Sequence, residues 1–93
     1  MPTRVPSFSG QFKRDMKLAK KRGKNMGTLE ILLGLLIDGQ TFPECYKDHS
    51  LSGDWASHRE CHIEPDWLLI YKFLDNGTGV RFERTGTHSD LFR

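Results

Sequence analysis

Three short stretches in the second half of the chain gather residue types that can move protons between reacting atoms. They read KDH at 47–49, HIEPDW at 62–67 and RTGTH at 84–88. Histidine can give or take a proton near neutral pH, a carboxylate can orient a histidine, and arginine can bind two oxygens of a phosphate. These types indicate acid–base chemistry with a cation to stabilise developing negative charge.

RNA is the substrate class that suits such a set, because it carries its own nucleophile in the 2′-hydroxyl. An enzyme acting on it needs a base for the 2′ proton, an acid for the departing 5′ oxygen and a cation for the phosphorane. Exposed aromatic side chains can stack on unpaired bases. Taken singly, each candidate also has an ordinary structural explanation, such as turn chemistry for Asp66 after Pro65.

Other kinds of site are less well supported. His58 and His62 are four residues apart, which on a strand separates their Cα atoms by ~13 Å, too far to share one ion. Neither Cys45 nor Cys61 has the spacing of a redox or zinc motif, and no serine lies in a glycine-flanked elbow. We expect no metal site and no cofactor, and we expect both cysteines to be reduced, with Cys61 a small core residue.

The elements that must position these residues follow from hydrophobic spacing and from turn residues. The pattern predicts, in chain order, an edge strand, two helices, three strands and a final helical turn, over residues 3–8, 9–23, 25–39, 55–63, 67–74, 80–85 and 88–92. This order predicts an α+β fold, with two helices packed on one face of a mainly antiparallel four-stranded sheet.

The predicted topology brings the candidates together at one end of that sheet. Asp66 starts a central strand and His62 ends its neighbour, so the hairpin between them places both at the same end. Arg84 ends the following antiparallel strand, and His88 comes shortly after it. His49 lies in the loop before the sheet and could fold over this end.

Charge is distributed unevenly along the chain. Residues 1–25 hold eight Lys and Arg against one acid, whereas residues 26–93 hold six against eleven, within a net charge of +2. A solvated helix face is the ordinary explanation, but so strong a skew also favours a polyanionic or an acidic protein partner. The candidate binding residues of this basic face, on the first helix and directly after it, are Lys13, Arg14, Lys17, Lys20, Lys21 and Lys24.

Length and composition set the remaining limits. With 93 residues and 37% hydrophobic content, the chain is expected to form one domain over 1–93. The longest apolar run covers residues 29–37, far short of the ~20 residues that a membrane span needs. No signal peptide is recognisable, so we expect a soluble, cytoplasmic protein.

Three longer strings that contain these motifs resemble a known family. They are KDHSLSG at 47–53, RECHIEPDWLLIY at 59–71 and RFERTGTHSDLF at 81–92. They resemble the YafQ branch of the RelE/ParE toxins from bacterial type II toxin–antitoxin systems. The resemblance implies a RelE-like fold and a ribosome-dependent mRNA interferase that cuts mRNA in the A site. It also implies a DinJ-like antitoxin that binds the toxin in a heterotetramer or larger complex. In that complex, operator DNA is expected to be bound only through the antitoxin.

The same resemblance implies roles for individual residues. His88 is expected to be the general acid, and Arg84 to stabilise the phosphorane. Asp66, with His49 or His62, is expected to act as the base or to orient it, and which of the three accepts the 2′ proton stays open. Two aromatic residues are expected to shape the site or to stack on bases, namely Trp67 and Phe92; core packing for the first and anchoring of the C-terminus for the second are equally ordinary explanations.

Two rival functions fit parts of the sequence. A ParE-like toxin shares the fold and poisons DNA gyrase, but is not expected to carry the His, Asp, Arg and His set. A non-catalytic nucleic-acid-binding module would use the basic helix alone.

Overall fold

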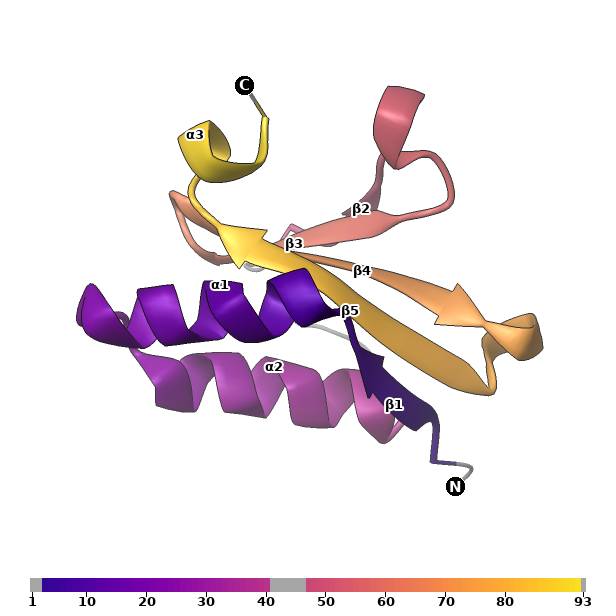
Figure 1. Ribbon diagram of the computed structural model, residues 1–93. Helices are drawn as coiled ribbons and strands as arrows, with labels where there is room; N and C mark the ends of the chain where they lie inside the picture. The colour runs from indigo at the N-terminus through magenta and orange to yellow at the C-terminus, as the bar shows by residue number, and fades with distance from the viewer. Residues whose placement is uncertain (1–2, 41–46, 93) are drawn as a thin grey trace.

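The computed structural model describes residues 3–40 and 47–92, so the expectation for Cys45 lies outside the described residues. Two helices cover one face of a twisted sheet, and a short third helix lies on the other side (Figure 1). The elements are β1 (Val5–Phe8), α1 (Gly10–Lys21), α2 (Met26–Ile37), β2 (His49–Ser50), η2 (Gly53–Trp55), β3 (Arg59–Glu64), β4 (Trp67–Leu74), η3 (Asp75–Gly77), β5 (Gly79–Gly86) and α3 (His88–Leu91).

Both long helices begin at polar capping residues. The Ser9 side chain accepts the backbone N–H of Phe12 at the start of α1, and Asn25 accepts that of Thr28 at the start of α2. Gly23 follows α1 with φ +79°, a conformation that costs glycine little. Both predicted helices are present, and their capping residues are the predicted ones at the N-terminal ends, but they end at Lys21 and Ile37, two residues before the predicted limits. No helix in the described part of the chain is long and apolar enough to cross a membrane.

The sheet has one strand more than predicted and is mixed, although it is mainly antiparallel, as expected. Five strands lie in the order β1-β5-β4-β3-β2, with β1 parallel to β5 and the other neighbours antiparallel. The sequence could not show β2, because two residues are too few for an alternating pattern. The α+β class is correct; the four-stranded description is wrong.

The predicted strand over 55–63 is also shorter in the structure. Only Arg59–Glu64 is extended, because the preceding segment turns twice through left-handed conformations, at Gly53 (φ +66°) and Ser57 (φ +72°). This segment contains η2 and folds back over the sheet instead of lengthening β3 (Figure 1).

The strand β4 divides the core into two parts. Its residues Trp67, Leu69 and Tyr71 belong to the main cluster, which also holds the buried faces of α1 and α2. Leu68 and Ile70 face the other way and pack with Leu91 of α3, with Leu51 and Trp55 alongside. The sheet therefore has a helix-covered face and a second face that, within residues 3–40 and 47–92, is partly covered by α3 and the η2 segment. We call the second one the open face.

Candidate active site

A histidine and an aspartate form the first half of the site. One oxygen of Asp66, in the β3–β4 turn, accepts the backbone N–H of His88 at 2.9 Å and lies 2.6 Å from its Nδ1. The pKa of Asp66 is lowered first by the backbone N–H and then by the imidazole. A carboxylate only accepts hydrogen bonds, so it holds the proton of His88 on Nδ1. The other ring nitrogen, Nε2, is left to exchange a proton with a substrate.

Two more histidines meet at a buried carboxylate. Glu60 is 4% exposed, and its Oε1 lies 3.2 Å from Nε2 of His62 and 3.4 Å from Nε2 of His49. The ring centroids of His49 and His62 are 6.2 Å apart, and those of His62 and His88 are 5.8 Å apart. The predicted convergence of the three histidines and Asp66 is therefore present in the structure.

Glu60 was not among the residues singled out by sequence reasoning. It stands two positions before His62, which on a strand puts both side chains on the same face, and that spacing was the available signal. Nothing in the sequence alone showed that the strand would bury this carboxylate between two imidazoles.

Strand pairing explains how the cluster comes to share the open face. Directly opposed residues on antiparallel strands point to the same side of a sheet. His49 opposes Glu60, Glu60 opposes Ile70, and His62 opposes Leu68. Ile70 and Leu68 face away from α1 and α2, so the histidines and their carboxylate do so too.

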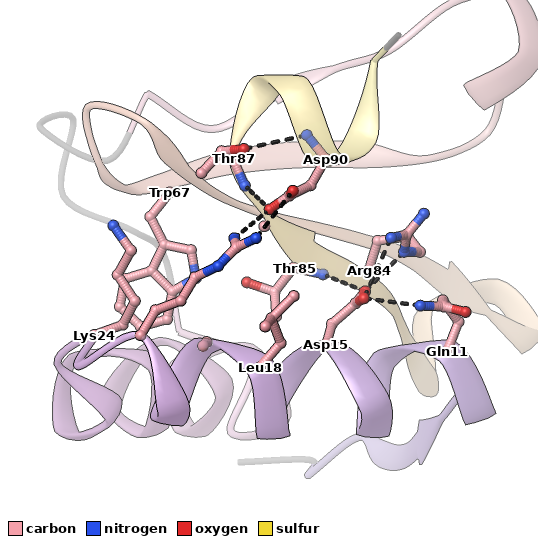
Figure 2. Close-up of a pocket in the computed structure, with 12 residues that line it drawn as sticks. Gln11, Asp15, Leu18, Lys24, Trp67, Arg84, Thr85, Thr87 and Asp90 are labelled. Atoms are coloured by element: carbon pink, nitrogen blue, oxygen red, sulfur yellow. Dashed lines mark hydrogen bonds and ion pairs between the residues drawn. The ribbon is translucent and has the colours of Figure 1, made fainter.

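Arg84 lies on the same face but its guanidinium is turned toward α1. Arg84 is on β5 and pairs with Ile70 of β4, which in turn pairs with Glu60 of β3. The backbones of Arg84 and Glu60 are therefore two strand spacings apart, about 10 Å. The Nε and Nη2 of Arg84 donate to the two oxygens of Asp15 at 2.7 and 3.2 Å (Figure 2). Asp15 is 7% exposed and also accepts the backbone N–H of Thr85 and the side-chain amide of Gln11. Because a guanidinium has five N–H donors, part of Arg84 remains able to bind a phosphate.

The two aromatic candidates differ in exposure. Trp67 is 1% exposed and packs in the main core, so stacking on a base is not open to it in this structure; of the two expectations, only shaping the site remains. Phe92 is 39% exposed, and its ring centroid lies 6.4 Å from that of His88. A base next to His88 could therefore reach Phe92.

The basic helix α1 presents most of its cations to solvent. Its exposed candidates are Lys13, Arg14, Lys17, Lys20 and Lys21. Lys24 is half-buried after the helix, and its Nζ lies 3.7 Å from Glu64. Arg22 is turned aside from this group by an ion pair with Asp90.

The other kinds of site considered from the sequence were a reactive cysteine and a metal centre. Cys61 is buried, and burial raises the pKa of its thiol, so it is the small core residue that the sequence indicated. Among residues 3–40 and 47–92, no group of three or more His, Cys, Asp or Glu has an arrangement that could hold a metal ion. The site therefore consists of an exposed histidine–aspartate pair beside a half-buried histidine–glutamate–histidine group.

Comparisons with known proteins agree on one family. The family described as the bacterial toxin of type II toxin–antitoxin system, YafQ, matches residues 4–93. The mRNA interferase toxin YafQ of Escherichia coli K12 is 52% identical over 86 residues, covering 91% of both chains. The putative toxin YafQ of Haemophilus influenzae is 38% identical over 88 residues, covering 89% of this chain and 86% of that protein.

Solved structures show the same likeness. The crystal structure of YafQ from E. coli BL21(DE3) superposes with a TM-score of 0.91 at 49% identity, covering 97% of this chain and 99% of that one. The toxin chain in the E. coli DinJ-YafQ toxin–antitoxin complex superposes with a TM-score of 0.89 at 50% identity, covering 98% and 99%.

Proposed function

The chain belongs to the YafQ family of toxins from bacterial type II toxin–antitoxin systems, and we propose that it is an mRNA interferase that cuts mRNA in the ribosomal A site. One observation carries the proposal: the ring of His88 is hydrogen-bonded to Asp66, and its centroid lies 5.8 Å from that of His62 on the open face of the sheet. Two imidazoles that approach one space from different directions are what acid–base cleavage of RNA requires.

In this mechanism His88 is the general acid. Its Nδ1 proton is held by Asp66, so the proton on Nε2 of the charged ring passes to the 5′ oxygen as the P–O5′ bond breaks. Asp66 orients the ring and stabilises its charged form, as a carboxylate does beside a catalytic histidine. Because both bonds from His88 end on one oxygen of Asp66, the backbone and the ring are oriented together.

His62 is the better-placed general base. Its Nε2 faces Glu60, so a proton held there leaves the lone pair on Nδ1 to accept the 2′ proton as the O2′–P bond forms. Both ring nitrogens of His49 face oxygens, those of Lys47 and Glu60, so that ring satisfies both only as a double donor. We assign it a charge-stabilising role. Asp66 is already engaged by His88.

Arg84 stabilises the phosphorane with the N–H groups that Asp15 does not use. Its charge is partly balanced by that carboxylate, so its contribution comes from directed hydrogen bonds more than from net charge. Phe92 stacks on a base beside His88, whereas Trp67 shapes the site from within the core. Magnesium or another metal has no assigned step in this scheme, and neither has a cofactor.

The basic face of α1 binds ribosomal RNA without reading its sequence. Neutralising Lys17, Lys20 and Lys21 together should weaken ribosome binding, with a log–log salt slope reduced by roughly 0.7–0.9 for each lost phosphate contact. The measurement is ribosome co-sedimentation between 50 and 200 mM salt, about the range over which such contacts are most visible. An unchanged slope would return these lysines to a merely solvated face.

The partner that restrains the toxin is an antitoxin of the DinJ type, since E. coli YafQ is found in a complex with DinJ. The stoichiometry is a heterotetramer or a larger assembly, and operator DNA is bound only through the antitoxin. Because the proposed substrate is mRNA on the ribosome, we expect the active toxin to act in the cytoplasm.

The decisive experiment is induced expression followed by mapping of the 5′ ends of a translated mRNA. Cuts in register with the reading frame support the proposal. Intact mRNA together with inhibition of DNA gyrase in a supercoiling assay would instead establish the ParE-like activity. Metal dependence is tested by adding EDTA and then restoring the magnesium that the ribosome needs. Cleavage that persists under these conditions separates this chemistry from hydrolysis that depends on another metal.

A further inference from the structure

The helix that carries His88 is too short to hold its own position. α3 covers four residues, His88–Leu91, and a single helical turn fixes several backbone angles for very few hydrogen bonds. Its orientation must therefore come from contacts with other elements. Two have been described: Leu91 packs against Leu68 and Ile70, and Asp66 accepts the His88 backbone N–H.

A third contact runs through Asp90. Its carboxylate accepts the backbone N–H of Thr87 at 3.0 Å, while its own backbone N–H donates to the Thr87 hydroxyl at 3.1 Å. This reciprocal pair is a capping box that closes the start of α3. The same carboxylate accepts two N–H groups of Arg22, Nη1 at 2.7 Å and Nη2 at 3.5 Å.

Arg22 belongs to the basic run of the sequence, but it is the capping residue at the C-terminal end of α1 and points to α3. The ion pair joins the two helices beside a cavity of about 220 Å³, which Figure 2 shows between α1 and the end of β5. Trp67 lines this cavity, and its indole N–H has no partner among the described residues. Direct packing between α1 and α3 is therefore incomplete here.

The backbone beside Asp90 leaves little freedom. A Cβ added at Gly86 would lie 2.9 Å from the Cβ of Asp90, closer than side chains tolerate. Asp90 therefore rests directly on the end of β5, and its carboxylate is also bound by Arg22. The pKa of Asp90 is lowered to about 2, first by the Arg22 hydrogen bond and next by the Thr87 backbone N–H, so the carboxylate is charged at neutral pH.

We propose that Asp90 and Arg22 are positioning residues for His88, tying α3 to the end of the basic helix so that the imidazole stays on Asp66. The inference rests on the proposed function, in which His88 is the general acid. Exposed ion pairs commonly contribute little, because ordering two long side chains costs entropy. Here the capping box already orders the carboxylate, so only the arginine loses freedom.

The test measures the helix and the reaction separately, on the full-length chain. Amide hydrogen exchange is followed at three amides of α3 and at the residue after it, all of which donate hydrogen bonds: His88, Asp90, Leu91 and Phe92. Steady-state cleavage on programmed ribosomes gives kcat and KM. The variants are Arg22→Ala, Asp90→Asn and the double variant. Asp90→Asn keeps an oxygen for the Thr87 N–H and removes the charge.

Each single variant should raise exchange at these amides and lower kcat together, by about threefold for a pair of this exposure, while KM changes little. The double variant should be no worse than either single one, because both remove the same interaction. Arg22→Lys should restore part of both effects. Lys20→Ala is the matched control: it removes a neighbouring charge from the binding face, so it should raise KM and leave exchange in α3 unchanged.

Unchanged exchange in Arg22→Ala and Asp90→Asn overturns the proposal, because the pair then does not hold α3. Faster exchange with unchanged kcat overturns it too, because the helix then moves without moving the acid. An Arg22→Ala effect confined to KM would make Arg22 another docking cation. Cleavage retained by His88→Ala would instead overturn the proposed function, so the two failures are distinguishable.

Discussion

The two halves of the site hold their histidines in opposite ways. In the acid half, the His88 and Asp66 side chains are 53% and 65% exposed, and His88 stands on a four-residue helix. In the base half, the side chain of Glu60 is 6% exposed and that of His62 is 21% exposed, and both stand on β3, where each pairs with a residue of β4. The acid half is exposed and is held by side-chain contacts from other elements, whereas the residues of the base half are part of a strand of the sheet.

The difference separates two means of positioning a catalytic side chain. A strand residue inherits its direction from the ladder of backbone hydrogen bonds, so the base half depends on the sheet as a whole. A residue on a single helical turn depends on individual side-chain contacts from distant parts of the chain. We therefore expect substitutions in the acid half to lower the cleavage rate without lowering the stability of the protein. Substitutions in the base half should lower both.

The largest effect should come from removing the acid itself. His88→Ala should lower the single-turnover cleavage rate by about 10²–10⁴, the usual contribution of a general acid or base, and abolish growth arrest. Circular dichroism should be unchanged, because the side chain is largely exposed and supports little of the core; retained antitoxin binding is the control for a folded toxin. Toxicity equal to that of the wild type would count against catalysis at this site and favour a non-catalytic binding module.

The two carboxylates provide the sharpest test of the comparison. Asp66→Asn and Glu60→Gln should each lower the cleavage rate, by less than the factor of about 10²–10⁴ expected for loss of a histidine. Only Glu60→Gln should also lower the free energy of unfolding, by roughly 1–3 kcal/mol, because a buried polar group loses a charged hydrogen-bond partner. Asp66→Asn should stay within about 0.5 kcal/mol. Urea unfolding measures both, and equal losses of stability would remove the distinction.

The two aromatic residues repeat the contrast on a smaller scale. Trp67→Phe should lower the free energy of unfolding by roughly 1–3 kcal/mol, because it leaves a void in the core. Cleavage by the folded fraction should change little. Phe92→Ala should do the reverse and weaken RNA binding by roughly 1–3 kcal/mol if it stacks on one base. A stable Trp67→Phe variant with a large KM effect would show that the indole reaches the RNA after all.

The smallest effect is the pH dependence of the Asp90 contact. The folded pKa of about 2 lies below the ordinary aspartate value of about 3.9. Asp90 therefore contributes stability that is fully present above about pH 4 and is lost as pH falls through 2. Solvent screening limits this to roughly 0.5–1 kcal/mol for such an exposed pair. The stability difference between the wild type and Asp90→Asn should be constant above pH 4 and shrink below it; a difference independent of pH would contradict the charge contribution.

Periodicity and turn residues were sufficient to predict much of this molecule. Ser9, Asn25 and Gly23 marked the helix ends, because capping is a local matter of one side chain and a few backbone groups. The turn at Pro65 and the lengths of the flanking strands placed His62 and Asp66 at one corner. The resemblance to the family, carried by short motifs around the same residues, indicated the toxin function.

What the sequence by itself determined, then, is the order of elements, the basic helix and the residues gathered at that corner. The tertiary structure alone decided three pairings: Glu60 between His49 and His62, Asp15 with Arg84, and Arg22 with Asp90. The last two join residues 69 and 68 positions apart. Local sequence patterns indicate which face of an element a side chain occupies. They do not indicate its charged partner, because that partner comes from a distant element and meets the side chain only when the helices and strands pack together.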